Sequence, residues 1–284
     1  MSQTRVAFQG ARGAFSEQAS KRILAGRELS YAPCAKFFEV FELLRDGAVD
    51  YAVVPVENTL HGSVHENYDH LLHYRPEILA ETHVRIVHNL IGRPEASRDQ
   101  ITRAISHPVA LAQCLDFFRR NPGISAETHY DTGGSVKTVM EGDDLSLGAV
   151  ASSSAAAYYG AKIIEPAIED DPENYTRFFL LGREPKAAES SGARKTSLVF
   201  VTKNLPGALF KCMSAFALRD INLTKIESRP LKGRPFEYCF YVDILASPQE
   251  QNCANAMSHL GEMTEFLVVL GTYEPASVSA ASSS

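Results

Sequence analysis

The stretch YAVVPVENTLHGSVHENYDHLLHY, residues 51–74, contains the two kinds of element that alternate through most of the chain. Residues 51–56 form a short apolar run, which is typical of a buried strand. After a polar turn, Val64, Tyr68 and Leu71 recur at the spacing of one helix face. A strand followed by an amphipathic helix is the repeating unit of α/β proteins, which bind ligands at the carboxyl ends of their strands.

The same alternation predicts α/β architecture from Arg5 to about Arg183. Further strands are predicted at RVAFQ (5–9), HVRIVHNLIG (83–92), ITRAIS (101–106), ISAETHY (124–130), LGAVAS (147–152) and RFFLLG (177–182). Further helices are predicted at SEQASKRIL (16–24), KFFEVFELLRDG (36–47), VALAQCLDFFRR (109–120), residues 135–141 and SSAAAYYG (153–160). Polar residues at the strand-to-helix junctions are therefore the first candidates for a binding site.

The composition changes after residue 183. The segment EPKAAESSGAR, residues 184–194, is rich in Ala, Ser and Glu without periodicity, and we interpret it as a linker. Residues 195–273 follow the order strand, helix, strand, strand, helix, strand, which is that of ferredoxin-like domains. The tail, residues 274–284, is of low complexity, and we expect it to be disordered.

The totals are those of an ordinary soluble globular protein, with 45% hydrophobic and 22% charged residues. No apolar run approaches the roughly 20 residues that span a membrane, and the first residues show no signal-peptide pattern, so we expect a cytoplasmic protein without a membrane partner. A net charge of −6 without a basic stripe disfavours nucleic acid as a partner. The five cysteines lack CxxC spacing, which favours reduced thiols over disulfides or a zinc site.

The first strand-to-helix junction is QGARGAFSE, residues 9–17. Backbone N–H groups at a helix N-terminus bind carboxylate or phosphate groups readily. The alternative is a glycine-rich turn without a ligand. The junction is not GxGxxG, and no acidic residue follows at the end of a second strand, which disfavours a dinucleotide.

The second junction places Glu57, Asn58 and Thr59 at the end of a buried strand. A carboxylate is costly in that position unless it is paired or has a function. The alternative is a cluster of capping and turn residues.

His61, His65 and Asp69 follow at spacings of four residues, which suggests a metal site on a helix. Gly62 and Ser63 interrupt the helix between the two histidines, so His61 is expected to lie outside it. A metal site is therefore disfavoured.

The third and fourth junctions also carry polar side chains. Ser106 closes a predicted strand and Gln113 lies in the helix that follows, although a serine before proline is commonly only a helix cap. Asp131 and Thr132 precede paired glycines and a helix, which predicts another anion-binding N-terminus. The alternative at the fourth junction is again a simple turn.

The stretch NYTRFFLLG, residues 174–182, begins with polar residues and continues as an apolar strand. Thr176 and Arg177 place a hydroxyl and a guanidinium at the mouth of the apolar run, which suits a strand end that faces a cleft. Together with the four junctions, this pair favours a small polyanionic ligand. The sequence shows no pattern of a Ser-His-Asp triad, a Walker loop or a nucleophilic cysteine site.

Seven motifs, in order, resemble those of one enzyme family. GARGAFSE, PVENTLHGSVHENYD, SHPVALAQC, DTGGSVK and NYTRFFLLG resemble the motifs of prephenate dehydratases and of plant arogenate dehydratases. GALF (207–210) and INLTKIESRP (221–230) resemble signatures of the C-terminal ACT regulatory domain of those enzymes. The resemblance covers the chain from about Arg5 to Tyr273.

The resemblance implies an α/β fold with two domains. The catalytic domain, residues 1–183, is expected to have two lobes like a periplasmic binding protein, and the ACT domain, residues 195–273, to be ferredoxin-like. Lobe 1 is expected at about residues 1–80 and 160–183, and lobe 2 at about residues 81–159.

The implied reaction is decarboxylation of prephenate with loss of its ring hydroxyl, giving phenylpyruvate, CO2 and water in L-phenylalanine biosynthesis, with no cofactor and no metal. Thr176 would donate a hydrogen bond to the leaving hydroxyl, Arg177 would bind a carboxylate, and Glu57, beside Asn58, is the candidate acid. A threonine hydroxyl is too weak an acid to protonate the leaving group alone, which favours a relay or electrostatic stabilisation. The implied substrate-binding residues are Gly13, Ala14, Phe15, Thr59, Ser106, Gln113, Asp131, Thr132 and Phe178.

Two positions depart from the family pattern. Val109 replaces the glutamine that usually follows Ser-His-Pro, which removes any polar contact of that glutamine and weakens the case for Ser106 and Gln113. Thr59 stands where many relatives have serine, so the hydroxyl is kept.

ACT domains bind amino acids at paired subunit interfaces, so the resemblance implies L-phenylalanine as effector and a homodimer or homotetramer. The expected effector-binding residues are Pro206, Gly207, Ala208, Leu209, Phe210, Asn222, Leu223, Glu227, Ser228, Arg229 and Pro230. From the residues alone, Glu227 and Arg229 could also be a surface ion pair. The sequence does not indicate whether phenylalanine inhibits or activates.

Two alternative functions stay open. Arogenate carries an amino group where prephenate has a keto oxygen, and either could be the substrate. A non-catalytic amino-acid sensor would share the two-lobed cleft and the ACT domain. Thr176 and Arg177, with Glu57 and Asn58, favour an enzyme, because a sensor has no need of a donor aimed at a leaving group.

Overall fold

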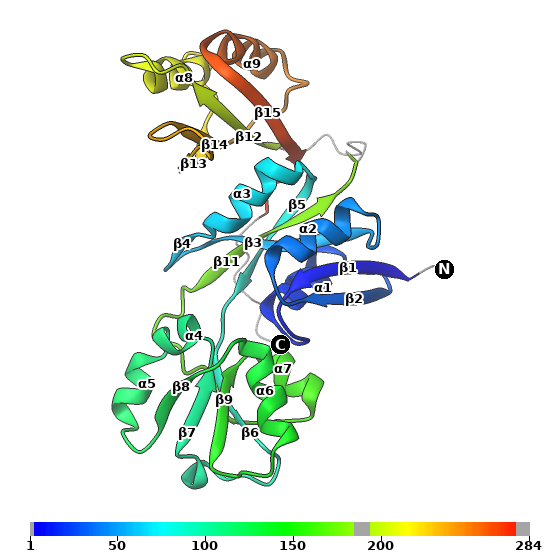
Figure 1. Cartoon of the computed structure of the whole chain (residues 1–284), viewed down its shortest axis with the longest axis vertical. Helices are drawn as coiled ribbons and strands as arrows, with labels where there is room; N and C mark the ends of the chain where they lie inside the picture. Colours follow the sequence, from blue (N-terminus) through cyan, green and yellow to red (C-terminus); the bar gives the residue numbers. More distant parts are fainter. Residues whose placement is uncertain (1–2, 185–193, 277–284) are drawn as a thin grey trace. The chain divides into compact units, whose positions relative to one another are not determined.

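The computed structural model describes residues 3–184 and 194–276 (Figure 1). The chain divides into two compact units. Among the described residues, the N-terminal unit contains 3–64 and 82–178, and the C-terminal unit contains the rest. Most of the expected linker (184–194) and of the expected tail (274–284) lies outside the described residues.

The first lobe is built on a sheet with the strand order β2-β1-β3-β11-β5, and the short β4 pairs with β3. Its strands are β1 (Thr4–Gln9), β2 (Leu29–Cys34), β3 (Tyr51–Asn58), β4 (Gly62–Ser63), β5 (Glu77–Arg85) and β11 (Tyr175–Gly182). β1 runs parallel to β2 and β3, and its residues Val6, Ala7 and Phe8 are fully buried. Helices α1 (Phe15–Ile23) and α2 (Phe37–Arg45) pack beside these strands (Figure 1).

The second lobe is built on a sheet with the strand order β10-β6-β9-β7-β8. Its strands are β6 (Asn89–Gly92), β7 (Arg103–Ser106), β8 (Ser125–Thr128), β9 (Leu147–Ala151) and β10 (Lys162–Glu165). Its helices are the 3-10 helix η1 (Arg98–Gln100), α4 (Pro108–Ala112), α5 (Leu115–Arg120), α6 (Thr132–Glu141) and α7 (Ser153–Tyr159). β7 is parallel to β8 and β9, so the two strand-to-helix junctions after β7 and β8 lie at one edge of the sheet.

Two predicted elements and one predicted lobe boundary differ from the observed structure. The helix predicted at 109–120 is two helices, because the carboxylate of Asp170 accepts hydrogen bonds from the backbone N–H groups of Leu115 and Asp116 and starts a second helix there. The strand predicted at 83–92 is β5 followed by β6, since the chain crosses between the two sheets at residues 86–88. β10 pairs with β6, so the second sheet extends beyond the expected lobe boundary at residue 159.

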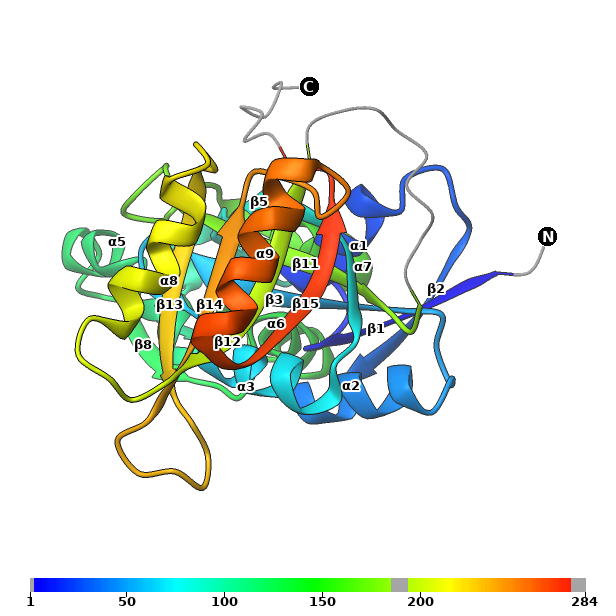
Figure 2. The ribbon, with the colours of Figure 1, turned by 90° about the horizontal axis from the view of Figure 1, so that it is seen from above.

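Within the C-terminal unit, residues 195–273 form an antiparallel sheet whose own helices cover one face (Figure 2). The strands, in sheet order, are β13 (Leu223–Pro230), β14 (Tyr238–Ile244), β12 (Lys195–Thr202) and β15 (Thr264–Tyr273). The core between this sheet and the helices α8 (Ala208–Ala217) and α9 (Gln251–Met263) includes Leu198, Phe216 and Leu260. The chain order β12-α8-β13-β14-α9-β15 is the expected ferredoxin-like order.

Helix α3 (His65–Tyr74) belongs to the C-terminal unit, although it lies far from the ACT-like segment in sequence. The Tyr68 and Tyr241 rings lie 4.9 Å apart, and the Tyr241 hydroxyl donates a 2.7 Å hydrogen bond to the Tyr68 carbonyl. Burial raises the pKa of Tyr241 far above its ordinary value, so this hydroxyl keeps its proton and remains a donor.

Two α/β lobes followed by an antiparallel sheet domain confirm the predicted fold class. None of the helices in the described segments is long and apolar enough to cross a membrane.

Candidate active site

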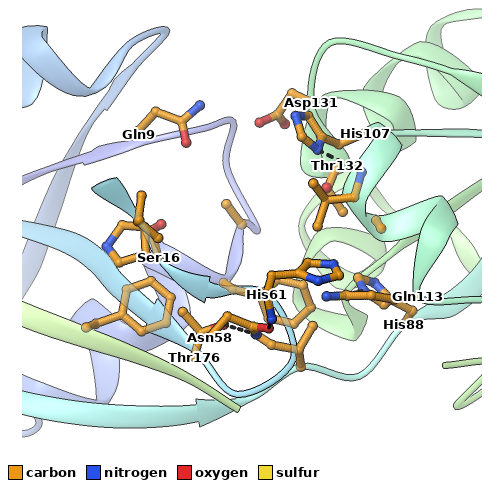
Figure 3. Close-up of a pocket in the computed structure, with 18 of the residues that line it drawn as sticks. Gln9, Ser16, Asn58, His61, His88, His107, Gln113, Asp131, Thr132 and Thr176 are labelled. Carbon is orange, nitrogen blue, oxygen red and sulfur yellow. Dashed lines mark hydrogen bonds between the residues drawn. The ribbon is translucent and has the colours of Figure 1, made fainter. Parts of the chain in front are cut away.

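A cleft of about 380 Å³ lies between the two lobes of the N-terminal unit (Figure 3). The first lobe contributes Gln9, Ala14, Phe15, Ser16, Phe37, Pro55, Asn58, His61, Gly62, Ser63, Val64, Thr176 and Phe178. The second lobe contributes His107, Val109, Ala110, Gln113, Asp131 and Thr132, and the crossing segment contributes Ile86 and His88. The volume lies in the range of small-molecule sites.

The cleft brings together residues from all four junctions singled out in the sequence and from the start of β11. The predicted site residues that line it are Ala14, Phe15, Asn58, Gln113, Asp131, Thr132, Thr176 and Phe178. Figure 3 shows Gln9 and Ser16 across the cleft from Asp131 and Thr132. Residues separated by more than a hundred positions therefore meet at one site.

Five predicted site residues are not among those that line the cleft. Ser106 is fully buried and donates a 2.6 Å hydrogen bond to the Val150 carbonyl in the neighbouring strand. The Thr59 hydroxyl donates to the Glu173 carbonyl at 2.9 Å. Both hydrogen bonds connect segments of the same lobe.

Arg177 and Glu57 also lie outside the lining. Side chains alternate along a strand, so Thr176 and Phe178 face the cleft while Arg177 between them faces the other side of β11. The Arg177 guanidinium is 7% exposed and lies 3.8 Å from the Glu57 carboxylate. The binding of a substrate carboxylate by Arg177 and the acid role of Glu57 stay predictions.

The fifth predicted residue outside the lining is Gly13, which packs between the lobes.

The hydroxyl of Thr176 is oriented by Asn58. The Asn58 amide oxygen accepts hydrogen bonds from the backbone N–H groups of Leu60 (2.9 Å) and His61 (3.0 Å), which identifies the other amide atom as the nitrogen. That nitrogen donates to Asn174 Oδ1 at 2.7 Å, to Thr176 Oγ1 at 3.0 Å and to the Tyr175 carbonyl at 3.2 Å. Because Thr176 Oγ1 accepts from Asn58, its own hydrogen is left to point toward the cleft.

Three histidines line the cleft. His88 is almost fully buried, and its Nε2 lies 2.8 Å from the Gln113 side-chain oxygen. Burial lowers the pKa of His88, so we expect a neutral ring with its proton on Nε2. His107 Nδ1 accepts from the Val109 N–H at 3.3 Å, which leaves Nε2 as the donor.

Sequence reasoning did not assign His61, His88 or His107 to substrate binding. His107 follows Ser106 directly at the third strand-to-helix junction, so the sequence did contain a signal for this residue. His88 lies where the chain crosses between the lobes, and no motif marks that position. His61 was considered only with His65, whose ring instead lies 3.3 Å from the Glu227 carboxylate. Among the residues that the structure describes, no three metal-ligating side chains gather into a site.

The two helix N-termini at the cleft differ in their capping. α6 is capped by Asp131, whose carboxylate accepts from the Gly134 N–H at 2.6 Å. α1 begins after Ala14, which has no side chain able to cap. The first-turn N–H groups of α1, at Phe15 and Ser16, are thus suited to an anion. No lysine or arginine is among the described residues that line the cleft.

The predicted effector segments lie in the C-terminal unit. Gly207 precedes α8 with a φ of +71°, and Phe210 in the first turn is 77% exposed. Along β13, Ser228 is exposed while Glu227 and Arg229 are half-buried and contact α3. The Arg229 guanidinium makes two hydrogen bonds to the Asp69 carboxylate, at 3.2 and 3.3 Å.

A protein-family model described as prephenate dehydratase matches residues 6–186. The chain belongs to the prephenate dehydratase family. Arogenate dehydratase/prephenate dehydratase 2 from Arabidopsis thaliana, a chloroplastic protein, is 42% identical over 281 residues, which are 96% of this chain and 73% of the relative. Arogenate dehydratase 2 from Petunia hybrida is 42% identical over 286 residues, covering 96% and 72%.

Two solved structures match nearly the full length of the chain. Prephenate dehydratase from Arthrobacter aurescens, in complex with L-Phe, is 29% identical with a TM-score of 0.87 and covers 97% of this chain and 93% of that one. A structure of GqqA, described as a novel type of quorum quenching acylase, is 32% identical with a TM-score of 0.88, covering 96% and 98%. The enzyme is a prephenate/arogenate dehydratase, a carbon–oxygen lyase of phenylalanine biosynthesis.

Proposed function

We propose that this enzyme acts on prephenate, that the Thr176 hydroxyl assists departure of the ring hydroxyl, and that L-phenylalanine bound to the C-terminal unit regulates the reaction. The observation that carries the catalytic part is the hydrogen bond from Asn58 to Thr176 in the cleft. It makes Thr176 a donor toward the cleft, where a leaving oxygen needs one.

Loss of CO2 and of the ring hydroxyl makes the ring aromatic, which supplies the driving force. The enzyme therefore needs to hold a dianion and to stabilise negative charge on the departing oxygen. Thr176 donates to that oxygen, and the Nε2–H of His107 is a further donor at the cleft. Because His107 Nδ1 is an acceptor, its ring is neutral, and its Nε2–H stabilises charge on the departing oxygen through a hydrogen bond rather than by giving up the proton.

The cleft has to bind the substrate carboxylates although no lysine or arginine is among the described residues that line it. The uncapped N-terminus of α1 offers N–H groups at Phe15 and Ser16, and the helix dipole favours negative charge there. The capped N-terminus of α6 is less available, because the Asp131 carboxylate already accepts from Gly134. We assign one carboxylate to α1 on this basis.

The hydrogen bonds that Asp131 already makes favour prephenate over arogenate as the substrate. Asp131 is the one carboxylate among the described lining residues, and an ammonium group such as that of arogenate would seek it. Its Oδ1 accepts from the Gly134 N–H at 2.6 Å and from the Ala11 N–H at 3.4 Å. Two backbone N–H groups thus already share Oδ1, which leaves less hydrogen-bonding capacity for an ammonium group and favours the keto group of prephenate.

The effector part of the proposal rests on β13. Glu227 and Arg229 belong to the segment expected to bind L-phenylalanine, and they contact His65 and Asp69 of α3. α3 follows directly after Val64, which lines the cleft. A ligand that moves β13 would therefore also displace α3, and α3 is joined through the backbone to Val64 in the cleft wall.

An oligomer would complete the effector site. β13 is an edge strand, with Ile226 49% exposed on it and Phe210 77% exposed on α8. An apolar edge of this kind is suited to pairing with a second copy of the chain. We propose a homodimer or homotetramer formed through this edge.

A cytoplasmic location of the protein stays a prediction.

Acylase activity, which is named for GqqA, is not favoured by this cleft. An acyl-transfer nucleophile is activated by a neighbouring base. Thr176 instead accepts a hydrogen bond from the Asn58 amide, which is no base.

The test is turnover of prephenate and of arogenate by the same preparation, with and without L-phenylalanine. We expect faster turnover of prephenate and a change when phenylalanine is added. A preference for arogenate would overturn the substrate assignment, and turnover insensitive to phenylalanine would overturn the regulatory one.

A further inference from the structure

The loop between β1 and α1 reaches from the first lobe into the second. The Gly13 carbonyl accepts a 2.7 Å hydrogen bond from the hydroxyl of Ser152, which caps α7. A Cβ at Gly13 would lie 2.4 Å from the Ala155 Cα, and the φ of Gly13 is +80°. Only glycine allows so close an approach. The two lobes thus touch at the loop, beside the cleft.

Arg12 lies next to this contact and is held between two aromatic rings. Its guanidinium carbon is 4.6 Å from the ring centre of Tyr31 in β2 and 4.5 Å from that of Tyr158 in α7. Tyr31 belongs to the first lobe and Tyr158 to the second. A cation within about 6 Å of an aromatic face is attracted to it, so Arg12 joins the two lobes.

Glu17 fixes the orientation of Arg12. Its carboxylate, 2% exposed, accepts from Arg12 Nε at 2.8 Å and from Nη2 at 3.2 Å. This two-point contact holds the planar guanidinium in one orientation. The cation is therefore already in place for Tyr158, and little freedom is lost when the lobes meet.

We propose that Arg12 and Tyr158 form a latch that holds the lobes at the spacing required for substrate binding, so that Tyr158 is a positioning residue. The inference rests on the proposed function for its kinetic readout. Ala14, Phe15 and Ser16 follow the latch directly and line one wall of the cleft. On the other lobe, α7 packs against α6, whose N-terminus lines the opposite wall.

Loss of the latch lowers the fraction of molecules in which the two lobes hold both walls of the cleft at the spacing required for substrate binding. Apparent affinity falls by that fraction, while the chemistry in the bound state is unchanged. Tyr158 is 50% exposed and the Arg12 side chain 30% exposed, and a cation–π contact at such an exposed site is strong enough for a change of about 3-fold. The expected signature is a higher KM with a nearly constant kcat.

The experiment compares Tyr158→Leu, which removes the aromatic ring, with Tyr158→Phe, which keeps it. Tyr51→Leu is the matched control, since Arg27 lies 5.5 Å from the Tyr51 ring within the first lobe. For each full-length variant, KM and kcat for prephenate are measured together with amide hydrogen exchange in residues 10–17 and 153–159. We expect Tyr158→Leu to raise KM about 3-fold and to speed exchange in both segments, with Tyr158→Phe and Tyr51→Leu close to wild type.

Wild-type exchange in both segments of Tyr158→Leu would overturn the latch, whatever the kinetics. So would a fall in kcat at constant KM, because that is loss of catalysis rather than of positioning. Failure of the wild-type enzyme to turn over prephenate would contradict the proposed function instead, and the exchange data would still decide the latch.

Discussion

The side-chain nitrogen of Asn58 lies 3.0 Å from the hydroxyl oxygen of Thr176, to which it donates a hydrogen bond. Two backbone N–H groups fix the Asn58 amide, so the direction of this bond is determined by the network around it. The consequence is chemical, because a hydroxyl that accepts on one side is free to donate on the other.

Asn58→Asp reverses that direction at nearly constant shape. The aspartate accepts the Thr176 hydrogen, which then no longer points into the cleft. We expect kcat for prephenate to fall by about 100-fold or more, the usual effect of removing one donor to a developing oxyanion. KM should change little. A kcat near that of wild type would show that the orientation of Thr176 is irrelevant.

Asp69→Asn weakens the contact between α3 and the effector strand, since Asp69 pairs with Arg229 and Lys232. We expect basal turnover to be kept and the response to L-phenylalanine to shrink by about 5-fold or more, within the range of coupling energies between sites. Glu66→Gln is the control, because Glu66 pairs only within α3 in the contacts observed, with His70 at 3.4 Å. Equal phenylalanine responses in Asp69→Asn and wild type would exclude α3 as the link.

Glu17 predicts a specific sensitivity to acid. Burial alone would raise its pKa, but hydrogen bonds from Arg12, from the Gly13 N–H and from Lys21 outweigh it and lower the pKa to about 2. A carboxyl whose pKa is lower in the folded state stabilises the fold above its unfolded pKa, and this contribution is lost as the pH falls toward the folded pKa.

The difference corresponds to about 3 kcal/mol, lost between roughly pH 5 and pH 2. The free energy of unfolding of Glu17→Gln should therefore fall less steeply over that window than that of wild type. Glu66→Gln, at an exposed carboxyl, should keep the wild-type slope. Parallel curves for Glu17→Gln and wild type would contradict the assignment.

Most of the architecture could be predicted from the sequence, because strand and helix periodicity are local. Local patterns failed where a distant residue decided the structure. Asp170 starts α5 inside a segment that reads as one helix, although it lies more than fifty residues further along the chain. β10 joins the second sheet through pairing with β6, which no local pattern could indicate.

The candidate site shows the same division. Thr176 and Asn58 could be selected from the sequence, because polar residues at the ends of apolar strands are unusual and strand ends face clefts. The direction in which Arg177 points depends on which face of β11 is covered, and that is a property of the assembled sheet. His88 enters the cleft only because the chain crosses between lobes there.

The measurement that tests the central claim most directly is kcat for prephenate in Thr176→Val and Thr176→Ser. Valine keeps the shape of threonine without the hydroxyl, and serine keeps the hydroxyl without the methyl group. We predict that Thr176→Val loses about 100-fold or more in kcat with the fold intact, and that Thr176→Ser retains most of the activity. Near-wild-type kcat in Thr176→Val would contradict the claim that the Thr176 hydroxyl assists the departing oxygen.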